Sequence, residues 1–152
     1  MTSVISKTFS LLVACLGFAM MTPGAAPSTD PLLPNPVLVF VGPEYYQTGG
    51  KSFIRYRYNV DNFSAYPSEL FAAAPNLPPC GANTKASRTW VDIYDQNGKR
   101  LYGFCALGSP SDLNKIWFAL EENAIPPSWV YIELTDRQTG TKYKSSLAET
   151  TM

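Results

Sequence analysis

The sequence has no histidine, and this absence excludes several kinds of site before any fold is considered. Without an imidazole, neither a Ser-His-Asp nor a Cys-His catalytic arrangement can form, and no metal can use a histidine ligand. Cysteines are also few: Cys15, Cys80 and Cys105 are the only three. The sequence contains no phosphate-binding or dinucleotide-binding glycine motif. We therefore expect a protein that is not an enzyme and has no cofactor or bound metal.

Charged residues are sparse at 16%, and the 12 basic residues balance the 12 acidic ones. Such a chain has no basic surface that would attract nucleic acid or anionic lipid, so we expect neither as a partner. Aromatic residues are plentiful, at 13% of the chain. This composition is typical of a sheet protein that exposes some tyrosine and tryptophan.

The N-terminus has the three parts of a secretory signal. Lys7 precedes an apolar run over residues 9–21, and Gly24 and Ala26 are the small residues expected before a cleavage site. The run is about 13 residues long, whereas a transmembrane helix needs roughly 20. We therefore expect a signal peptide at 1–26 and a secreted or periplasmic mature protein. In an alternative reading, residues 12–15 form a lipobox and Cys15 carries a lipid anchor.

Removal of residues 1–26 would leave two cysteines, Cys80 and Cys105. A pair of cysteines in an oxidising compartment predicts one disulfide. This bond would close a loop of about 26 residues and restrict the unfolded chain by roughly 3.5 kcal/mol.

The mature chain divides into a proline-rich lead-in at 27–36, a folded domain at 37–147 and a tail at 148–152 that we expect to fray. Strand-forming residues and turn signals alternate through the folded domain. They predict seven short strands: 37–41, 52–60, 88–95, 99–107, 113–120, 129–135 and 141–146. The expected fold is all-β, a seven-stranded antiparallel β-sandwich.

Asn97-Gly98 lies between two of these segments and predicts a hairpin with a two-residue type I′ turn. That turn would place Asp95 opposite Arg100, Ile93 opposite Tyr102 and Val91 opposite Phe104, all facing the core. The opposite face would carry Trp90, Asp92 and Tyr94. We expect the long irregular segment 61–87, pinned through Cys80, to cover that face with residues 70–79.

One local motif resembles a known family. Ile125, Pro127 and Tyr131 have the spacing found before strand F of fibronectin type III domains. The resemblance to these immunoglobulin-like modules implies a tyrosine corner, in which the Tyr131 hydroxyl bonds to nearby backbone. It implies no function, because one fold hosts many functions.

Several residues are candidates for binding. Tyr45 and Tyr46 lie beside a glycine-rich turn, and aromatic loop residues favour interfaces. Trp90, Asp92 and Trp117 are the remaining candidates: an acid flanked by aromatics can hold a sugar, although Asp92 can equally bond to the covering loop or to Arg88. Asn62-Phe63-Ser64 is a glycosylation sequon.

The leading hypothesis is an exported, non-catalytic β-sandwich that binds a protein or helps to assemble an envelope or secreted complex. A carbohydrate-binding module is the alternative, and it predicts an exposed row formed from Trp90, Trp117 and Trp129. A small hydrolase is a third reading. Its carboxylates would be Asp92 with another acid, because Glu121 and Glu122 are neighbours on a strand and point to opposite faces.

Overall fold

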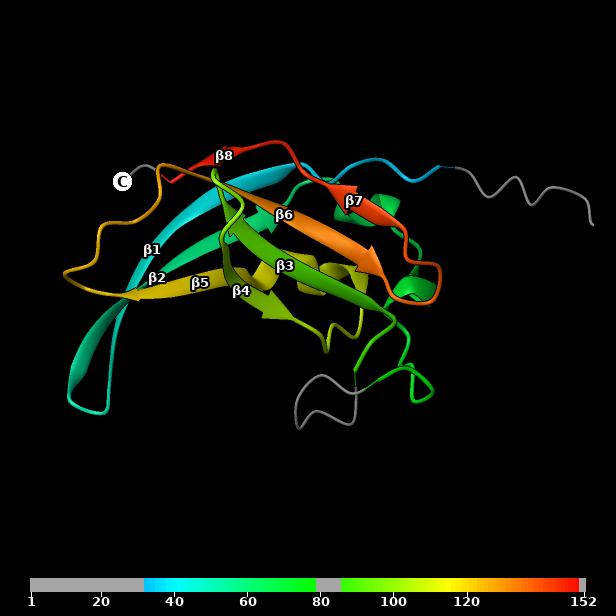
Figure 1. Ribbon diagram of the computed structural model, residues 1–152, viewed down its shortest axis with the longest axis horizontal. Coiled ribbons are helices and arrows are strands. Elements are labelled where there is room, and N and C mark those ends of the chain that lie inside the picture. The colour runs from blue at the N-terminus through cyan, green and yellow to red at the C-terminus, as the bar shows by residue number, and fades with distance from the viewer. Residues whose placement is uncertain (1–31, 79–85, 151–152) are drawn as a thin grey trace, which may run out of the picture. The chain divides into compact units, whose positions relative to one another are not determined.

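The computed structural model describes residues 32–78 and 86–150, which form two antiparallel sheets (Figure 1). The strands are β1 (Leu38–Thr48), β2 (Lys51–Val60), β3 (Thr89–Asp95), β4 (Arg100–Phe104), β5 (Ile116–Glu121), β6 (Trp129–Asp136), β7 (Lys142–Lys144) and β8 (Ala148–Glu149). Three short 3-10 helices join them: η1 (Phe63–Ala65), η2 (Ser68–Phe71) and η3 (Pro110–Lys115). The described residues thus contain eight strands, one more than expected. The all-β, sandwich-like architecture is confirmed.

The smaller sheet has the order β1-β2-β5, and the larger one has β4-β3-β6-β7 with β8 also paired to β6. The chain crosses between the sheets after β2, after β4 and after β5. Alternating side chains from both sheets meet in one core. Its largest fully buried members include Tyr56, Tyr58 and Phe118 of the smaller sheet and Ile93, Ile132 and Leu134 of the larger one.

The strand β1 is longer than predicted, because Gly42-Pro43 does not end it. A bulge between Phe40 and Gly42 absorbs the irregularity, with φ of 141° at Gly42. Pro43 pairs with Tyr56 at a non-hydrogen-bonded position of an edge strand, where its missing N–H is not needed by β2. The hairpin closes at Gly49-Gly50, whose φ values of 58° and 74° are those of a type I′ turn.

The β3–β4 hairpin has a different turn from the one predicted. Only Gly98 has a positive φ, 82°, and the backbone N–H of Asp95 donates to the Lys99 carbonyl. The turn is therefore a three-residue loop, and the two-residue prediction is wrong. A bulge then pairs Tyr94 with Arg100, so that Ile93 still faces Tyr102 and Val91 still faces Phe104. The extra residue in the loop and the bulge at Tyr94 offset each other. The predicted pairs Ile93–Tyr102 and Val91–Phe104 are therefore confirmed.

Burial across this hairpin is uneven. Val91 and Ile93 are fully buried as predicted, but Tyr102 keeps 40% of its surface exposed. The reason is that β4 is an edge strand, so its apolar side chains have core neighbours on one side only.

The segment expected to be a strand at 113–120 begins as a helix. Ser109 and the Asp112 side chain form a capping box around η3, and Pro110 occupies its first turn. The strand β5 therefore starts only at Ile116. Leu113 is nevertheless fully buried in the core.

The long segment after β2 matches the predicted cover of the outer face of the β3–β4 hairpin only in part: its Pro78 carbonyl accepts from Arg137, which covers Trp90, but η2 lies elsewhere. Leu70 and Phe71 in η2 are buried in the core itself, and Pro67 occupies the N-cap position of that helix. Ala73 makes a bridge to Ser87. Cys80 lies outside the described residues, so the Cys80–Cys105 disulfide stays a prediction.

The C-terminal residues 148–150 belong to the fold, which corrects the prediction of a frayed tail. Ala148 and Glu149 pair with Val130 and Trp129 of β6. The Tyr58 and Thr150 hydroxyl oxygens lie 2.7 Å apart, both side chains being buried. Burial raises the pKa of Tyr58 to about 12.

Candidate functional site

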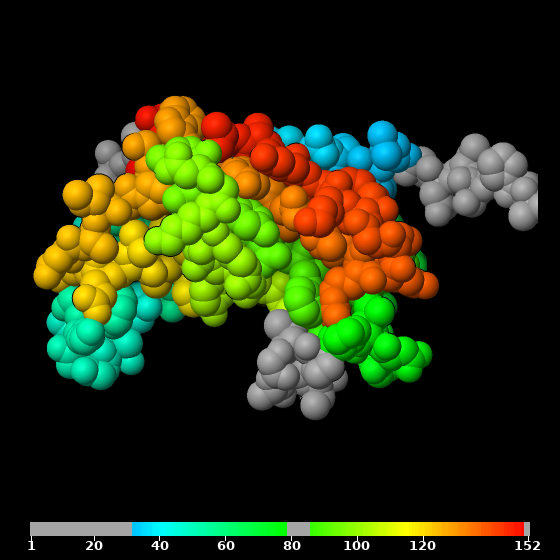
Figure 2. Space-filling model, in the orientation of Figure 1, coloured from blue at the N-terminus to red at the C-terminus, as the bar shows by residue number. Residues whose placement is uncertain are grey.

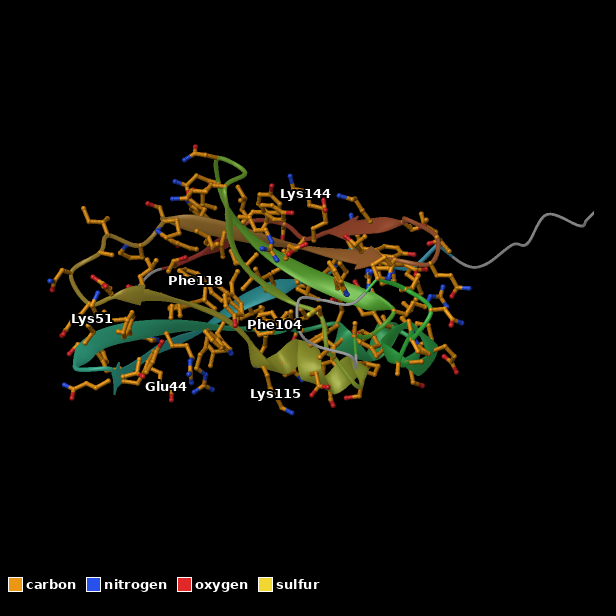
Figure 3. All side chains as sticks on the ribbon, turned by 60° about the horizontal axis from the view of Figure 1, so that its bottom comes forward. Glu44, Lys51, Phe104, Lys115, Phe118 and Lys144 are labelled. Carbon is orange, nitrogen blue, oxygen red and sulfur yellow. The ribbon has the colours of Figure 1, made fainter. Side chains whose placement is uncertain are left out.

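The outer face of the smaller sheet gathers aromatic and charged side chains. Side chains along each strand point alternately to the core and to this face. The residues on this face include Glu44 and Tyr46 of β1, Arg55 and Arg57 of β2, and Trp117 of β5. The register pairs Glu44 with Arg55 and Arg57 with Trp117. Glu44 and Lys115 lie on one side of the molecule and Lys144 on the other (Figure 3).

Five side chains form a continuous aromatic–arginine stack: Tyr46, Arg55, Trp117, Tyr102 and Phe104. The Arg55 guanidinium carbon lies 4.9 Å from the Tyr46 ring centroid and 4.5 Å from that of Trp117. Trp117 stacks on Tyr102 at 4.8 Å, and Phe104 meets Trp117 edge to face at 5.9 Å. The stack thus runs from the smaller sheet onto β4 of the larger one. Each such contact contributes on the order of 0.5–1.5 kcal/mol, so the arrangement is held in place without a ligand.

One carboxylate serves both arginines of this face. The Glu44 Oε2 atom lies 3.3 Å from Arg55 and 3.9 Å from Arg57. The Arg57 side chain keeps 51% of its surface exposed. The buried Nε of Arg55 has no hydrogen-bond partner among the described residues, so stacking and the single hydrogen bond to Glu44 hold that guanidinium.

A shallow hollow of about 250 Å³ opens beside the stack. The residues that line it are Glu44, Arg55, Arg57, Asn114, Lys115, Ile116 and Trp117. The Lys115 ammonium bonds Asp112 at 3.0 Å and, as the largest influence, lowers the pKa of that carboxyl group.

The hairpin tip between β1 and β2 projects beyond the other described elements (Figures 1 and 2). Tyr45 and Tyr46 point to opposite faces of this hairpin. Tyr45 is 62% exposed. Tyr46 belongs to the stack, and the centre of its ring also lies 5.5 Å from that of Phe53. Of the predicted binding residues, Tyr46 and Trp117 belong to the stack, where Arg55 links them.

Trp90 and Asp92 lie elsewhere, on the outer face of the larger sheet. The Arg137 guanidinium covers the Trp90 ring at 3.8 Å and donates to the Pro78 carbonyl at 2.8 Å. Asp92 forms an ion pair with Arg100 at 2.6 Å. The expected partner Arg88 binds Asp136 instead.

Tyr131 does not form the expected tyrosine corner. Its ring lies on the outer face of the larger sheet, stacked on Tyr94 at 5.2 Å with the Lys144 ammonium 3.9 Å above it. Its hydroxyl makes no hydrogen bond within residues 32–78 and 86–150. The neighbouring Val130 and Ile132 occupy the core positions, and this alternation turns Tyr131 outward.

The other candidates are held in structural contacts. The Asn62 side chain accepts from the Val37 N–H and donates to the Asn35 carbonyl. Glu121 pairs with Lys51 at 2.6 Å. The described part of the chain contains no cluster of three metal-binding side chains, and none of its helices is long and apolar enough to cross a membrane.

Sequence reasoning missed Glu44, Arg55, Arg57 and Tyr102. The alternation of 52–60 does place Arg55 and Arg57 away from the core, and pairing across a hairpin at Gly49-Gly50 would have found Glu44. Tyr102 carries no such signal, because its contact with Trp117 joins two sheets. No known protein family, curated protein or solved structure matches the chain.

Proposed function

We propose that this protein is a non-catalytic, exported binding module that contacts another protein through the outer face of its smaller sheet. The observation that carries the proposal is the aromatic–arginine stack of Tyr46, Arg55, Trp117, Tyr102 and Phe104. Tyrosine, tryptophan and arginine are enriched in the residues that dominate protein interfaces. Side chains already fixed by one another lose little conformational freedom on binding.

The same contacts favour a protein over a sugar as the ligand. A sugar ring needs the free face of an aromatic side chain, but Arg55 and Tyr102 already lie against Trp117. Arg137 covers Trp90. Trp129 is 41% exposed, but it belongs to β6 in the larger sheet and does not continue a row with Trp117.

Three of the carboxylates that catalysis could use form ion pairs, which supports a non-catalytic role. Asp92 bonds Arg100, Glu121 bonds Lys51, and Glu133 bonds Lys142, each at 2.6 Å. The chain offers no histidine as a general base. The signal-like residues 1–26 support the exported location.

The order of the strands supports an immunoglobulin-like or fibronectin type III-like domain. With β1, β2 and β5 as strands A, B and E, and β3, β6 and β7 as C, F and G, the larger sheet contains the strands of one immunoglobulin sheet and the smaller one those of the other except strand D. The strand β4 then takes the place of strand C′ beside C. A Cys80–Cys105 disulfide would pin the segment after β2 in this domain.

The experiment is affinity capture from the protein's own secreted or envelope fraction, run beside a glycan array. Wild type, Tyr102→Ala and Trp129→Ala are compared, since both side chains are about 40% exposed but only Tyr102 belongs to the stack. The proposal predicts one captured protein that Trp129→Ala retains and Tyr102→Ala loses. Capture that is insensitive to Tyr102, or glycan binding that depends on Trp129, would overturn it.

A further inference from the structure

The hollow beside the stack has more positive than negative charge. Its lining includes three cations, Arg55, Arg57 and Lys115, but only one carboxylate, that of Glu44. Arg55 is held by stacking and by the nearer Glu44 contact. Within the described residues, Arg57 has no ion pair other than the 3.9 Å contact with the same Glu44 oxygen. Arg57 is therefore the cation with capacity for another acceptor.

We propose that this hollow receives a carboxylate side chain from an extended, acidic segment of a partner protein. This inference rests on the proposed function and names the chemistry of the partner. The carboxylate bonds Arg57, with Lys115 nearby, and a guanidinium binds a carboxylate through two parallel N–H donors. In an extended segment the residue two positions along lies on the same side and reaches the exposed ring of Tyr102.

The size and setting of the hollow favour one carboxylate rather than a polyanion. Its volume of about 250 Å³ suits a side chain. The chain as a whole has 12 basic and 12 acidic residues, so it has no extended positive field that would attract a nucleic acid or a sulfated polymer.

Glu44 competes with an incoming carboxylate for Arg57, so its substitution gives a direct test of the proposal. Replacing Glu44 by glutamine removes that competing charge and leaves the stacking partners of Arg55 in place. Glu44→Gln is thus expected to bind an acidic ligand more tightly, and Arg57→Gln more weakly. A gain in affinity cannot arise from misfolding.

The test uses 15N-labelled protein expressed from the full sequence and an acetylated, amidated probe peptide, Gly-Glu-Ser-Phe-Ser-Glu-Gly, in which the phenylalanine lies two positions from each glutamate. The control peptide has glutamine in place of each glutamate. Lys99→Ala is the matched protein control, since it removes one exposed positive charge from the β3–β4 turn. Amide shifts are followed at about 20 mM and about 200 mM salt, where an exposed ion pair is screened to different extents.

The proposal predicts shifts centred on Arg57, Lys115 and Trp117 with the glutamate peptide. We expect affinity to fall about fivefold in Arg57→Gln, to rise about twofold in Glu44→Gln, and to stay unchanged in Lys99→Ala. Equal binding of the glutamine peptide would overturn the acidic partner while leaving the binding face in place. Absence of binding, shifts on the larger sheet, or shifts caused by protein concentration alone would also overturn it.

Discussion

The Arg55 guanidinium lies 4.5 Å from the centre of the Trp117 ring, and this contact joins β2 to β5 across the outer face of the smaller sheet. Trp117→Ala removes this contact together with the Tyr102 and Phe104 contacts, so we expect it to lower the free energy of unfolding by about 2–3 kcal/mol. Arg55→Met keeps the aliphatic stem and should cost about 1 kcal/mol.

Urea unfolding of both single variants and the double variant measures the coupling between the two residues. A cation–π contact predicts a coupling of about 0.5–1 kcal/mol. Additive effects would show that the two side chains do not stabilise each other.

The Arg88–Asp136 ion pair predicts a dependence of stability on acid. Asp136 accepts from Arg88 Nε at 2.8 Å, from its second nitrogen at 2.6 Å, and from the Thr139 hydroxyl. The Arg88 hydrogen bond is the largest influence that lowers the pKa of Asp136 from 3.8 to about 2. The unfolded chain therefore takes up the proton first, and the stabilisation of about 2 kcal/mol is lost as pH falls from about 4 to about 2.

Asp136→Asn should be less stable than wild type by about that amount at pH 7, and the gap should narrow as pH falls from about 4 and close near pH 2. Asp61→Asn, on an exposed residue, is the matched control. A gap that stays constant from pH 7 to pH 2, measured by thermal unfolding, would show that the charge of Asp136 does not stabilise the fold.

In the turn between β3 and β4, we expect substitution of Gly98 to cost more stability than substitution of Asn97. Gly98 has a φ of 82°, a conformation that costs a residue with a side chain about 1–2 kcal/mol. Asn97 has no positive φ. Gly98→Ala is therefore expected to destabilise the protein by about 1 kcal/mol and Asn97→Ala by a few tenths. Equal losses in urea unfolding would favour the type I′ turn that the structure does not show.

The pairing of β8 with β6 predicts that the C-terminus matters for stability. Deleting residues 148–152 removes two strand pairings and the buried Thr150 hydroxyl next to Tyr58. We expect a loss of about 2 kcal/mol or more, because the Tyr58 hydroxyl is left buried. Tyr58→Phe in the truncated chain should recover part of this loss. A truncated chain as stable as wild type in calorimetry would mean that these residues fray.

Local periodicity predicted the sheet-forming segments, because alternation reports which side chains face a core. It predicted the buried Val91 and Ile93 but not the exposure of Tyr102, since that depends on β4 being an edge strand. The predicted strand 37–41 ended too early, because a bulged edge strand tolerates Gly42 and Pro43.

The binding face was less predictable than the fold. Trp117 and Tyr46 were candidates as single aromatic residues, but their connection through Arg55 requires the β1–β2–β5 order. The contact of Trp117 with Tyr102 depends on how two sheets meet at their edges. Neither relationship is encoded in the spacing of residues along the chain.

Photo-crosslinking in the cells that make the protein tests the binding face most directly. A benzophenone side chain replaces Phe53, which lies beside Tyr46 on the outer face of the smaller sheet. The matched position is Tyr94, an aromatic residue stacked on Tyr131 in the larger sheet. We predict a crosslinked protein adduct from position 53 and none from position 94. An adduct from position 94 alone, or none from either, would contradict the proposed binding face.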